Sequence, residues 1–499
     1  KDNLNVEEKR MKNQKNRSEF LKKADKYVQD NAEKIKNHQF RQKYHFEVPS
    51  GWCNDPNGFS YQRGSYQLFY QHMPYSANPA DFVMYWGHAK SNDLVHWENL
   101  PIAIGPDSNE DISGCWSGCS FEKDGKSFIY YTGLDKNQRQ KQCLAISDDG
   151  INFNKYEGNP ILGETLCEAE EGDFRDPFIW KHEGKYYMLL GSSKGGFGCI
   201  PLYESYDGIT WKFKNLLVES LGELGTVCEC PNFVEINGKY VLFMSPHGMN
   251  YRKSIYLVGD FDYITGKFFW HNYGEIDWGM DYYAPQIIAN ERGEKISIGW
   301  MNSWDWMPWS DGNYFTTEMG WCGGMSLPRK IWLDEDNRLC SKPVEEIEVL
   351  RDNKYVWKEI EIEDNTFEIE TKDNRHLEMK IIIDTQKCTA DQIKMTLGNK
   401  KSYYIEVIVD VKKAELIFNR NNDLQKKAGI RKCNLKSVTQ EKTELHIYLD
   451  SSSIEIFSDE YTTAMTNTFY LPENEKCLTL ESLNGKTLFT QIDIWNMKA

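Results

Sequence analysis

Residues 59–70 read Phe59-Ser-Tyr-Gln-Arg-Gly64-Ser-Tyr-Gln-Leu-Phe-Tyr70: an apolar start, a polar turn that ends in glycine, and an aromatic-rich return. Such a segment is typical of a β-hairpin. The pattern occurs four more times before residue 302, and its turn glycines are Gly64, Gly125, Gly184, Gly238 and Gly293. One repeat therefore takes 54 to 61 residues. A hairpin at this period predicts the blades of a propeller, each a small four-stranded sheet.

A second marker supports the blades. The pattern Ser-x-Asp-x-x-x-aromatic occurs at residues 91–97, 147–153 and 205–211, so its copies lie 56 and 58 residues apart. Asp and Gly in these segments suit a turn between the third and fourth strands of a blade. The markers together predict five blades, which begin at about Tyr44.

The flanking segments have other compositions. Residues 1–17 are charged and almost without apolar side chains, which is typical of a disordered end, whereas Ser18 to about Lys36 has apolar residues at helical spacing. After about Val344, alternating runs such as Tyr404-Ile-Glu-Val-Ile-Val predict an antiparallel β-sandwich. We therefore expect an all-β protein: a charged segment with a short N-terminal helix (1–43), a five-bladed β-propeller (44–343) and a C-terminal β-sandwich (344–499).

Charge and composition exclude several classes of partner. The net charge of −16 argues against nucleic acid and against an anionic membrane surface. No stretch approaches the roughly 18–20 apolar residues of a membrane helix, and no signal-peptide core is visible. The thirteen cysteines are odd in number and evenly spread, without a disulfide framework. We therefore predict free thiols and a cytoplasmic location, and the oligomeric state stays open.

Three carboxylates occupy one place in the repeat. Asp55, Asp176 and Glu229 each lie eight or nine residues before the turn glycine of their own repeat. Equivalent positions on the innermost strands of radially arranged blades face one central axis. The sequence therefore predicts that three acids from three blades converge on one pocket, which is the geometry of an active site.

The motifs around these acids resemble glycoside hydrolase family 32, which comprises invertases, sucrose-6-phosphate hydrolases, inulinases and levanases. The resemblance covers about Tyr44 to Lys330 in order, and the sandwich more weakly. The motifs are Trp52-Cys-Asn-Asp55-Pro-Asn-Gly58, Tyr85-Trp-Gly-His-Ala89, Trp116-Ser-Gly118, Phe174-Arg-Asp176-Pro177, Glu229-Cys-Pro231 and Tyr283-Ala-Pro-Gln286. Six motifs in the right order are a specific signal, although each alone would be a poor one.

The resemblance implies a role for each acid. In that family the Asp of Asn-Asp-Pro-Asn is the nucleophile, the Glu of Glu-Cys-Pro is the acid/base, and the Asp of Arg-Asp-Pro stabilises the transition state. These roles fall on Asp55, Glu229 and Asp176. A retaining mechanism would place the carboxyls of Asp55 and Glu229 about 5–5.5 Å apart. Because an acid must hold its proton near neutral pH, we expect burial and the two other carboxylates to raise the pKa of Glu229.

Two neighbouring residues are harder to assign. Arg175 would either keep Asp176 ionised or form a structural ion pair, and consecutive residues of a strand point to opposite faces. Asn54 meets the same objection. The matching Asn of the family contacts sugar, so the resemblance implies a substrate contact at Asn54.

Further substrate contacts implied by the resemblance are Trp52, Gln71, Trp116 and Ser117, and we also expect Arg175 to be a substrate-binding residue. Sugar faces stack on aromatic rings, and sugar hydroxyls need amide and hydroxyl partners. The alternative for the two tryptophans is a place in the blade core, since the chain has sixteen. We interpret His88 and His96 as hydrogen-bonded core histidines.

The chain also departs from the family pattern. Asp81-Phe-Val-Met-Tyr-Trp-Gly-His88 stands where many relatives have Trp-Gly-Asn-Met-His-Trp-Gly-His, so Asp81 or Phe82 replaces an aromatic wall of the pocket. Asn232 and Cys119 replace an Asp and a Ser. A carboxylate at the pocket mouth would repel an anionic substrate, which favours neutral sucrose over sucrose 6-phosphate.

The sequence thus predicts a β-fructofuranosidase that acts on sucrose or short fructo-oligosaccharides, with no metal or organic cofactor, because two carboxylates suffice. The alternatives are a sucrose-6-phosphate hydrolase, a fructosyltransferase, an arabinoside- or xyloside-cleaving relative and a catalytically silent sugar-binding propeller. A 6-phosphate would call for basic residues near the rim of the pocket. The candidates by loop position are His247, Arg252 and Lys253.

Overall fold

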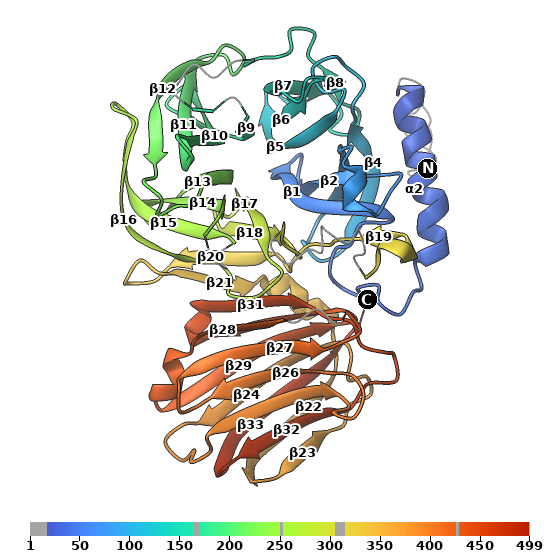
Figure 1. Ribbon diagram of the computed structural model, residues 1–499, viewed down its shortest axis with the longest axis vertical. Coiled ribbons are helices and arrows are strands. Elements are labelled where there is room, and N and C mark those ends of the chain that lie inside the picture. Colours follow the sequence, from blue (N-terminus) through green and yellow to red (C-terminus); the bar gives the residue numbers. More distant parts are fainter. Residues whose placement is uncertain are drawn as a thin grey trace.

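The computed structural model of the protein describes residues 17–163, 169–170, 172–249, 253–304, 315–425 and 429–498. In Figure 1 a ring of sheets forms the upper part of the molecule, and two stacked sheets form the lower part. Nearly all regular structure in the described ranges is β-strand. The all-β class predicted from the sequence is confirmed, together with its order of propeller and sandwich.

Five sheets follow one another along the ring. The first contains β1 (Gly51–Gln62), β2 (Ser65–Met73), β3 (Tyr85–Ser91), β4 (Trp97–Ile104) and the short β19 (Trp321–Cys322). The second contains β5 (Gly114–Lys123), β6 (Lys126–Leu134), β7 (Gln140–Ser147) and β8 (Asn154–Lys155). The third contains β9 (Phe174–His182), β10 (Lys185–Lys194), β11 (Phe197–Ser205) and β12 (Lys212–Glu219). The fourth contains β13 (Val227–Ile236), β14 (Lys239–His247), β15 (Ile255–Asp262) and β16 (Lys267–Glu275), and the fifth β17 (Tyr283–Ala289), β18 (Lys295–Trp300), β20 (Arg329–Leu333) and β21 (Leu339–Pro343).

The first strand of each sheet lies on the inside of the ring (Figure 1). These strands contact one another in the cyclic order β1, β5, β9, β13, β17 and back to β1. Strand β19 precedes β20 of the fifth sheet in the chain, yet it pairs in parallel with β1 through Gly51–Trp321 and Trp52–Cys322. The last sheet is thus tied to the first, which closes the propeller.

All five innermost strands carry a β-bulge, one extra residue relative to the strand beside them. The bulges lie between Cys53 and Pro56 in β1, Trp116 and Gly118 in β5, Arg175 and Phe178 in β9, Glu229 and Asn232 in β13, and Tyr283 and Gln286 in β17. At three of them Asp176, Cys230 and Ala284 have positive φ angles of 61°, 51° and 48°. A bulge with such a backbone re-aims its side chains and is over-represented next to active sites.

Helix α2 (Glu19–Ile35), which the sequence predicts, packs on the outside of the first sheet (Figure 1). Its N-cap Ser18 accepts a hydrogen bond from the backbone N–H of Leu21, and Leu21 and Ala24 are buried. Short 3₁₀ helices span Pro79–Asp81, Thr317–Met319, Glu345–Leu350, Lys436–Thr439 and Asp459–Tyr461. No helix in the described part of the chain is long and apolar enough to cross a membrane.

Two six-stranded antiparallel sheets form the sandwich. One contains β22 (Arg351–Glu363), β33 (Lys486–Met497), β24 (Leu377–Asp384), β29 (Lys442–Asp450), β30 (Ser453–Ser458) and β31 (Thr463–Thr468). The other contains β23 (Thr366–Ile369), β32 (Leu478–Leu483), β25 (Gln392–Gly398), β26 (Tyr404–Asp410), β27 (Glu415–Asn422) and β28 (Ile430–Asn434). Alternate residues of both sheets, such as Ile405, Val407 and Val409 of β26, are buried in one core between them.

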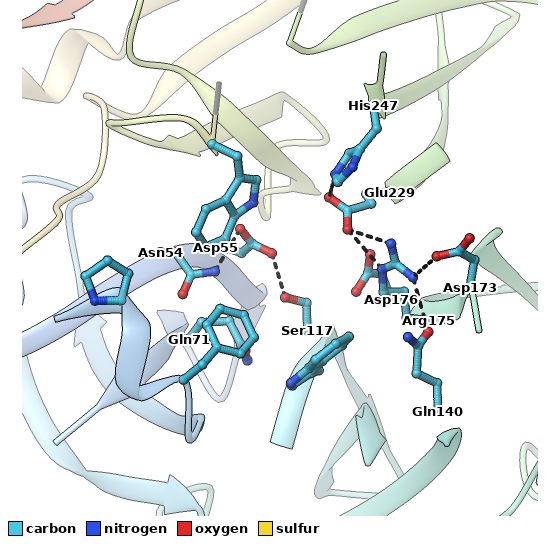
Figure 2. Close-up of a pocket in the computed structure, with 14 residues that line it drawn as sticks. Asn54, Asp55, Gln71, Ser117, Gln140, Asp173, Arg175, Asp176, Glu229 and His247 are labelled. Atoms are coloured by element: carbon cyan, nitrogen blue, oxygen red, sulfur yellow. Dashed lines mark hydrogen bonds and ion pairs between the residues drawn. The ribbon is translucent and has the colours of Figure 1, made fainter. Parts of the chain in front are cut away.

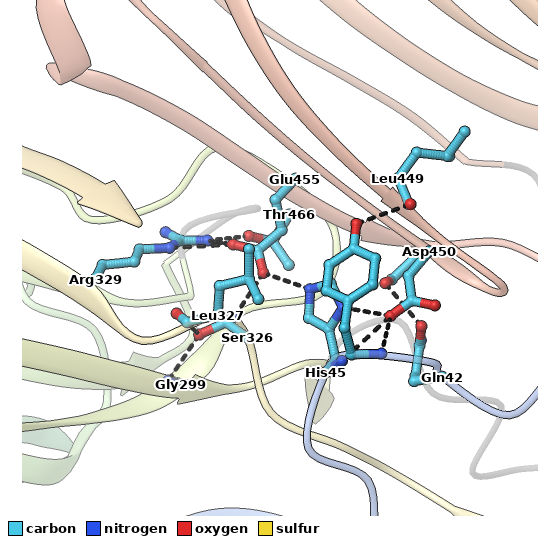
Figure 3. A network of polar contacts seen from close by, with 12 residues as sticks. Gln42, His45, Gly299, Ser326, Leu327, Arg329, Leu449, Asp450, Glu455 and Thr466 are labelled. Carbon is cyan, nitrogen blue, oxygen red and sulfur yellow. Dashed lines mark hydrogen bonds and ion pairs between the residues drawn. The ribbon is translucent and has the colours of Figure 1, made fainter. Parts of the chain in front are cut away.

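A buried ionic cluster joins sandwich and propeller, and we call it the interface cluster: His45, Asp277, Arg329, Asp450 and Glu455. Figure 3 shows four of its members: the ring nitrogens of His45 lie 2.8 Å from Asp450 Oδ2 and 3.0 Å from Glu455 Oε1. Arg329 binds Glu455 through Nη2 and Asp277 through Nη1, the latter at 2.9 Å. None of the five side chains is more than 1% exposed. Buried charges require such pairing, so the cluster fixes how the two parts meet.

Candidate active site

A cavity of about 550 Å³ opens at the centre of the propeller, where the bulges lie. Polar residues form most of its wall: Asn54, Asp55, Gln71, Ser117, Gln140, Asp173, Arg175, Asp176, Glu229 and His247. Pro79, Phe82, Trp116 and Trp304 complete it. A mixed wall of aromatic rings and hydrogen-bonding groups suits a sugar, which has apolar faces and a rim of hydroxyls.

The structure brings the three predicted carboxylates together from β1, β9 and β13 (Figure 2). Asp55 accepts hydrogen bonds from Ser117 Oγ at 2.7 Å and from Asn54 Nδ2 at 3.1 Å. The thiol of Cys230 lies 3.5 Å from one oxygen of Asp55 and 3.5 Å from one oxygen of Asp176. A single sulfur atom therefore contacts two of the three acids.

Burial raises the pKa of both aspartates. Burial raises the pKa of Asp55 to about 6, in spite of the hydrogen bond from Ser117, and the charge of Glu229 contributes further to the rise. Burial and then the charge of Glu229 raise the pKa of Asp176 to about 7. Both carboxylates are thus poorly compensated by their protein neighbours.

Glu229 has the opposite environment, which corrects the sequence prediction of a raised pKa. Burial would raise its pKa, but Arg175, then His247, and the hydroxyl of Tyr283 hold it well below its usual range. Nε and Nη2 of Arg175 both lie 2.9 Å from Oε1, while His247 Nε2 and Tyr283 Oη lie 2.7 and 2.6 Å from Oε2. The error arose because sequence reasoning counted the two neighbouring anions and missed the partners of Glu229 that come from other strands.

Arg175 resolves the alternative left open by the sequence. Its guanidinium makes ion pairs with Glu229 and with Asp173, whose Oδ1 lies 2.8 Å from Nη1. It also donates a hydrogen bond to Gln140 Oε1 at 3.2 Å. The charge of Arg175 also lowers the pKa of Asp176, but burial and the charge of Glu229 outweigh it. Arg175 thus serves mainly as the partner of Glu229.

The bulges explain why consecutive residues share the pocket, contrary to strand alternation. Asn54 and Asp55 both line the cavity, as do Arg175 and Asp176. In each case the extra residue of the bulge turns the second side chain toward the first. The sequence held a signal for this: prolines follow at Pro56, Pro177, Pro231 and Pro285. A proline inside a strand is confined to edges and bulges.

The predicted substrate contacts Asn54, Gln71, Trp116, Ser117 and Arg175 all line the cavity. Trp52 is not among the lining residues, because its ring is fully buried in a core cluster. Its Nε1 donates a hydrogen bond to Asn54 Oδ1 at 2.7 Å, so Trp52 holds Asn54 in place. The sequence analysis missed Pro79, Gln140, Asp173 and Trp304, which come from loops or strand ends without a motif of their own.

Phe82, not Asp81, forms the wall at the departure from the family pattern. Asp81 is exposed and is not among the residues that line the cavity. Phe82 makes an edge contact with Trp116 at 5.9 Å between ring centroids and a tilted contact with Trp304 at 6.3 Å. The wall therefore stays aromatic, with a phenyl ring supplied one residue later.

Other predicted residues lie away from the cavity or contribute differently. His88 is buried and hydrogen-bonded to Gln67, as expected, but the prediction of a core position for His96 was wrong, because it is exposed beside Asp93. Lys253 is buried and donates to the carbonyl of Gly279, so it does not reach the rim. Arg252 lies outside the described residues. Of the phosphate candidates, His247 alone is known to line the cavity.

The sequence matches two family models along nearly its whole length. Residues 45–343 match the glycosyl hydrolases family 32 N-terminal domain, and residues 346–496 match the family 32 C-terminal domain. The chain belongs to glycosyl hydrolase family 32. It is a glycosidase.

Named relatives of family 32 are similar over most of their length. The chain is 34% identical to a sucrose-6-phosphate hydrolase of Zymomonas mobilis, over 91% of this chain and 92% of the relative. It is 31% identical to a raffinose invertase of Escherichia coli, over 91% and 94%. A Bombyx mori GH32 beta-fructofuranosidase superposes with a TM-score of 0.80 at 30% identity, over 96% of this chain and 98% of the other.

Proposed function

We propose that the protein releases fructose from sucrose or short fructo-oligosaccharides, with retention of configuration. The proposal rests on one observation above all, the convergence of Asp55, Asp176 and Glu229 in the cavity of a family 32 propeller. A retaining glycosidase needs one carboxylate to attack the anomeric carbon and one carboxyl to protonate the leaving oxygen. Names of relatives such as invertase and beta-fructofuranosidase agree with this reaction.

In the proposed mechanism Asp55 is the nucleophile. Ser117 and Asn54 hold its carboxylate at fixed geometry, so that an oxygen can form the bond to the fructosyl carbon. Glu229 protonates the departing oxygen and then takes a proton from the water that releases fructose. Asp176 binds fructosyl hydroxyls and stabilises the positive charge that develops on the sugar.

The remaining wall would bind the sugars. Asn54, Gln71 and Ser117 offer amide and hydroxyl groups, Arg175 orients Glu229, and Trp116 offers a ring face for stacking. Trp52 would act by holding Asn54. In this proposal the catalytic domain is residues 44–343, and 344–499 form an accessory sandwich. The free thiols of the described cysteines favour a reducing, cytoplasmic location.

A second candidate substrate is sucrose 6-phosphate, which the names of several relatives favour. The cavity wall argues for the neutral sugar. Asp55, Asp173, Asp176 and Glu229 line it, whereas the basic groups among the described lining residues are Arg175 and His247, both bound to Glu229. A phosphate dianion would meet net repulsion there.

The test compares kcat/KM for sucrose, sucrose 6-phosphate, 1-kestose and inulin, with Glu229→Ala beside the wild type. We expect release of fructose, with sucrose preferred to its 6-phosphate. Glu229→Ala should lose about 100-fold or more on sucrose, less on an activated fructoside with a good leaving group, and azide should restore turnover there. Equal losses on both substrates without rescue would contradict the role of Glu229, and a tenfold preference for the phosphate would contradict the neutral substrate.

A further inference from the structure

Asp173, Arg175 and Glu229 carry charges of alternating sign across the wall of the cavity, and Glu229 in turn contacts His247, which is positive when protonated (Figure 2). Asp173 directly precedes β9, and three different strands supply the others: Arg175 comes from β9, Glu229 from β13, and His247 from the end of β14. Glu229 is enclosed, with a side chain 14% exposed, while that of His247 is 43% exposed. His247 therefore links an enclosed carboxylate to the open side of the cavity.

This arrangement poses a problem for the proposed chemistry. Glu229 must carry a proton when the glycosidic bond breaks, but its protein partners favour the ionised carboxylate. Arg175 has no proton to give, because a guanidinium stays charged in proteins. The hydroxyl of Tyr283 already donates to Oε2 and is far less acidic than an imidazolium. Of the described contacts of Glu229, only His247 Nε2 can give up a proton near neutral pH.

We propose that His247 is a positioning residue that stores the proton of the acid/base Glu229 and transfers it along the 2.7 Å contact when sugar fills the cavity. The inference rests on the proposed role of Glu229. Before sugar binds, the pair consists of imidazolium and carboxylate. The proton moves from Nε2 to Oε2, which leaves neutral imidazole and neutral carboxylic acid, and no net charge enters or leaves.

The later steps use this proton and then recover one from water. Glu229 gives it to the leaving oxygen, which keeps the electron pair of the broken glycosidic bond, while an oxygen of Asp55 bonds to the fructosyl carbon. A water then attacks that carbon, its proton goes to Glu229, and the bond to Asp55 breaks toward the carboxylate. After fructose leaves, the proton returns to His247.

Several charged or titratable groups face the pair. Arg175 of β9 contacts Glu229 from one side, and Tyr283 of β17 contacts Glu229 from another. Asp55 of β1 and Asp176 of β9 interact electrostatically with Glu229 across the cavity. A bound sugar would separate Glu229 from solvent and weaken the ionised form, which drives the proton from the imidazolium to the carboxylate.

The first experiment measures kcat/KM against pH for His247→Gln, which keeps an N–H donor but holds no transferable proton. The basic limb should move about one pH unit or more toward acid, because Glu229 beside Arg175 must then be protonated from solvent. The loss at pH 7.5 should be about tenfold or more and should shrink toward pH 5. A loss that is equal at every pH would overturn the proposal, since it would indicate a purely structural role.

The matched control is His96→Gln. His96 forms a similar contact with Asp93, 2.7 Å from Nδ1 to Oδ2, but it is not among the cavity residues. Its pH profile should coincide with that of the wild type. Glu229→Ala separates the two hypotheses: if it loses turnover of sucrose as expected while His247→Gln keeps the wild-type profile, the role of Glu229 stands and the role of His247 is wrong.

A binding measurement avoids turnover. In Asp55→Asn, sucrose binding at pH 7 is followed by calorimetry in two buffers of different ionisation enthalpy. With His247 present, net proton uptake should be near zero, because the proton moves within the pair. With Asp55→Asn and His247→Gln combined, uptake should rise toward one proton per sucrose. Equal uptake in both variants would overturn the proposal.

Discussion

The cavity and the interface cluster both bury carboxylates, but they compensate them differently. In the interface cluster, Asp450 and Glu455 are held by His45 and by backbone N–H groups, and Arg329 adds two bonds to Glu455. In the cavity, Asp55 has only two neutral donors and a weak thiol contact. The difference lies in the number of donors that reach each oxygen.

The pKa values follow the donors. Burial opposes ionisation in both places, yet the bond to His45 lowers the pKa of Asp450 to about 2, and Arg329 followed by His45 lowers that of Glu455. In the cavity, burial prevails and the pKa of Asp55 rises to about 6. The paired charges of the interface cluster have a structural role, whereas the incomplete pairing of Asp55 leaves a carboxylate that can react with a sugar.

The largest effect should come from Asp55→Asn. Loss of the proposed nucleophile should lower kcat for sucrose by about 1,000-fold or more, because no covalent intermediate would form. The fold should tolerate the change, and thermal unfolding should occur at the same or a higher temperature at pH 7, since a poorly compensated charge is removed. Retention of more than about 1% of kcat would disprove the assignment.

Breaking the interface cluster should have the opposite effects: lower stability and nearly unchanged activity. Arg329→Met leaves Asp277 without its cation and Glu455 with His45 alone, and should lower the free energy of unfolding by about 3–5 kcal/mol. The kcat/KM of the folded enzyme at 25 °C should change less than about twofold, since the cluster does not line the cavity. The control is Arg338→Met, which breaks a partly exposed pair with Asp334 and should cost about 1 kcal/mol or less.

The two regions should also differ in the pH range over which they affect stability. Bonds to Asp450 and Glu455 outweigh burial and raise the pKa of His45 from 6.5 to about 9, so its contribution is fully present below pH 6.5 and is lost as the pH rises through 9. For Asp55 the folded pKa is also raised, from 3.8 to about 6. Stability is therefore lost as the pH rises from about 4 to about 6.

Each of these two pH-dependent losses should lower the free energy of unfolding by on the order of 3 kcal/mol. Thermal unfolding from pH 4 to 9.5 should show that Asp55→Asn removes the lower window and His45→Gln the upper one. If His45→Gln kept the loss between pH 6.5 and 9, another group would be responsible.

The smallest effect is expected at Asp81. Because this carboxylate is exposed and does not line the cavity, Asp81→Asn should change the ratio of kcat/KM for sucrose and sucrose 6-phosphate by less than about twofold. This revises the sequence-based expectation that Asp81 sets the preference. A change of fivefold or more would show that Asp81 reaches the substrate.

Local sequence was sufficient for the fold and for the three acids. Hairpins at regular spacing specify blades, since each turn glycine and its flanking strands act within about a dozen residues, and the ring closes by repetition. Asp55, Asp176 and Glu229 converge because they hold equivalent places in that repeat. The alternating runs after Val344 likewise predicted the sandwich, whose core forms from the buried alternate residues.

The tertiary structure determined which hydrogen-bond donors and cations reach these three carboxylates. The pairing of Arg175 with Glu229, the contact of His247 and the donation from Tyr283 join residues 18 to 54 positions apart. The bulges overrode strand alternation and put Arg175 and Asp176 in one cavity. A pKa depends on every charge and donor within a few ångströms, and most of those neighbours of Glu229 come from other strands. Sequence could therefore place the acids, but only the packed blades determine which of them is ionised.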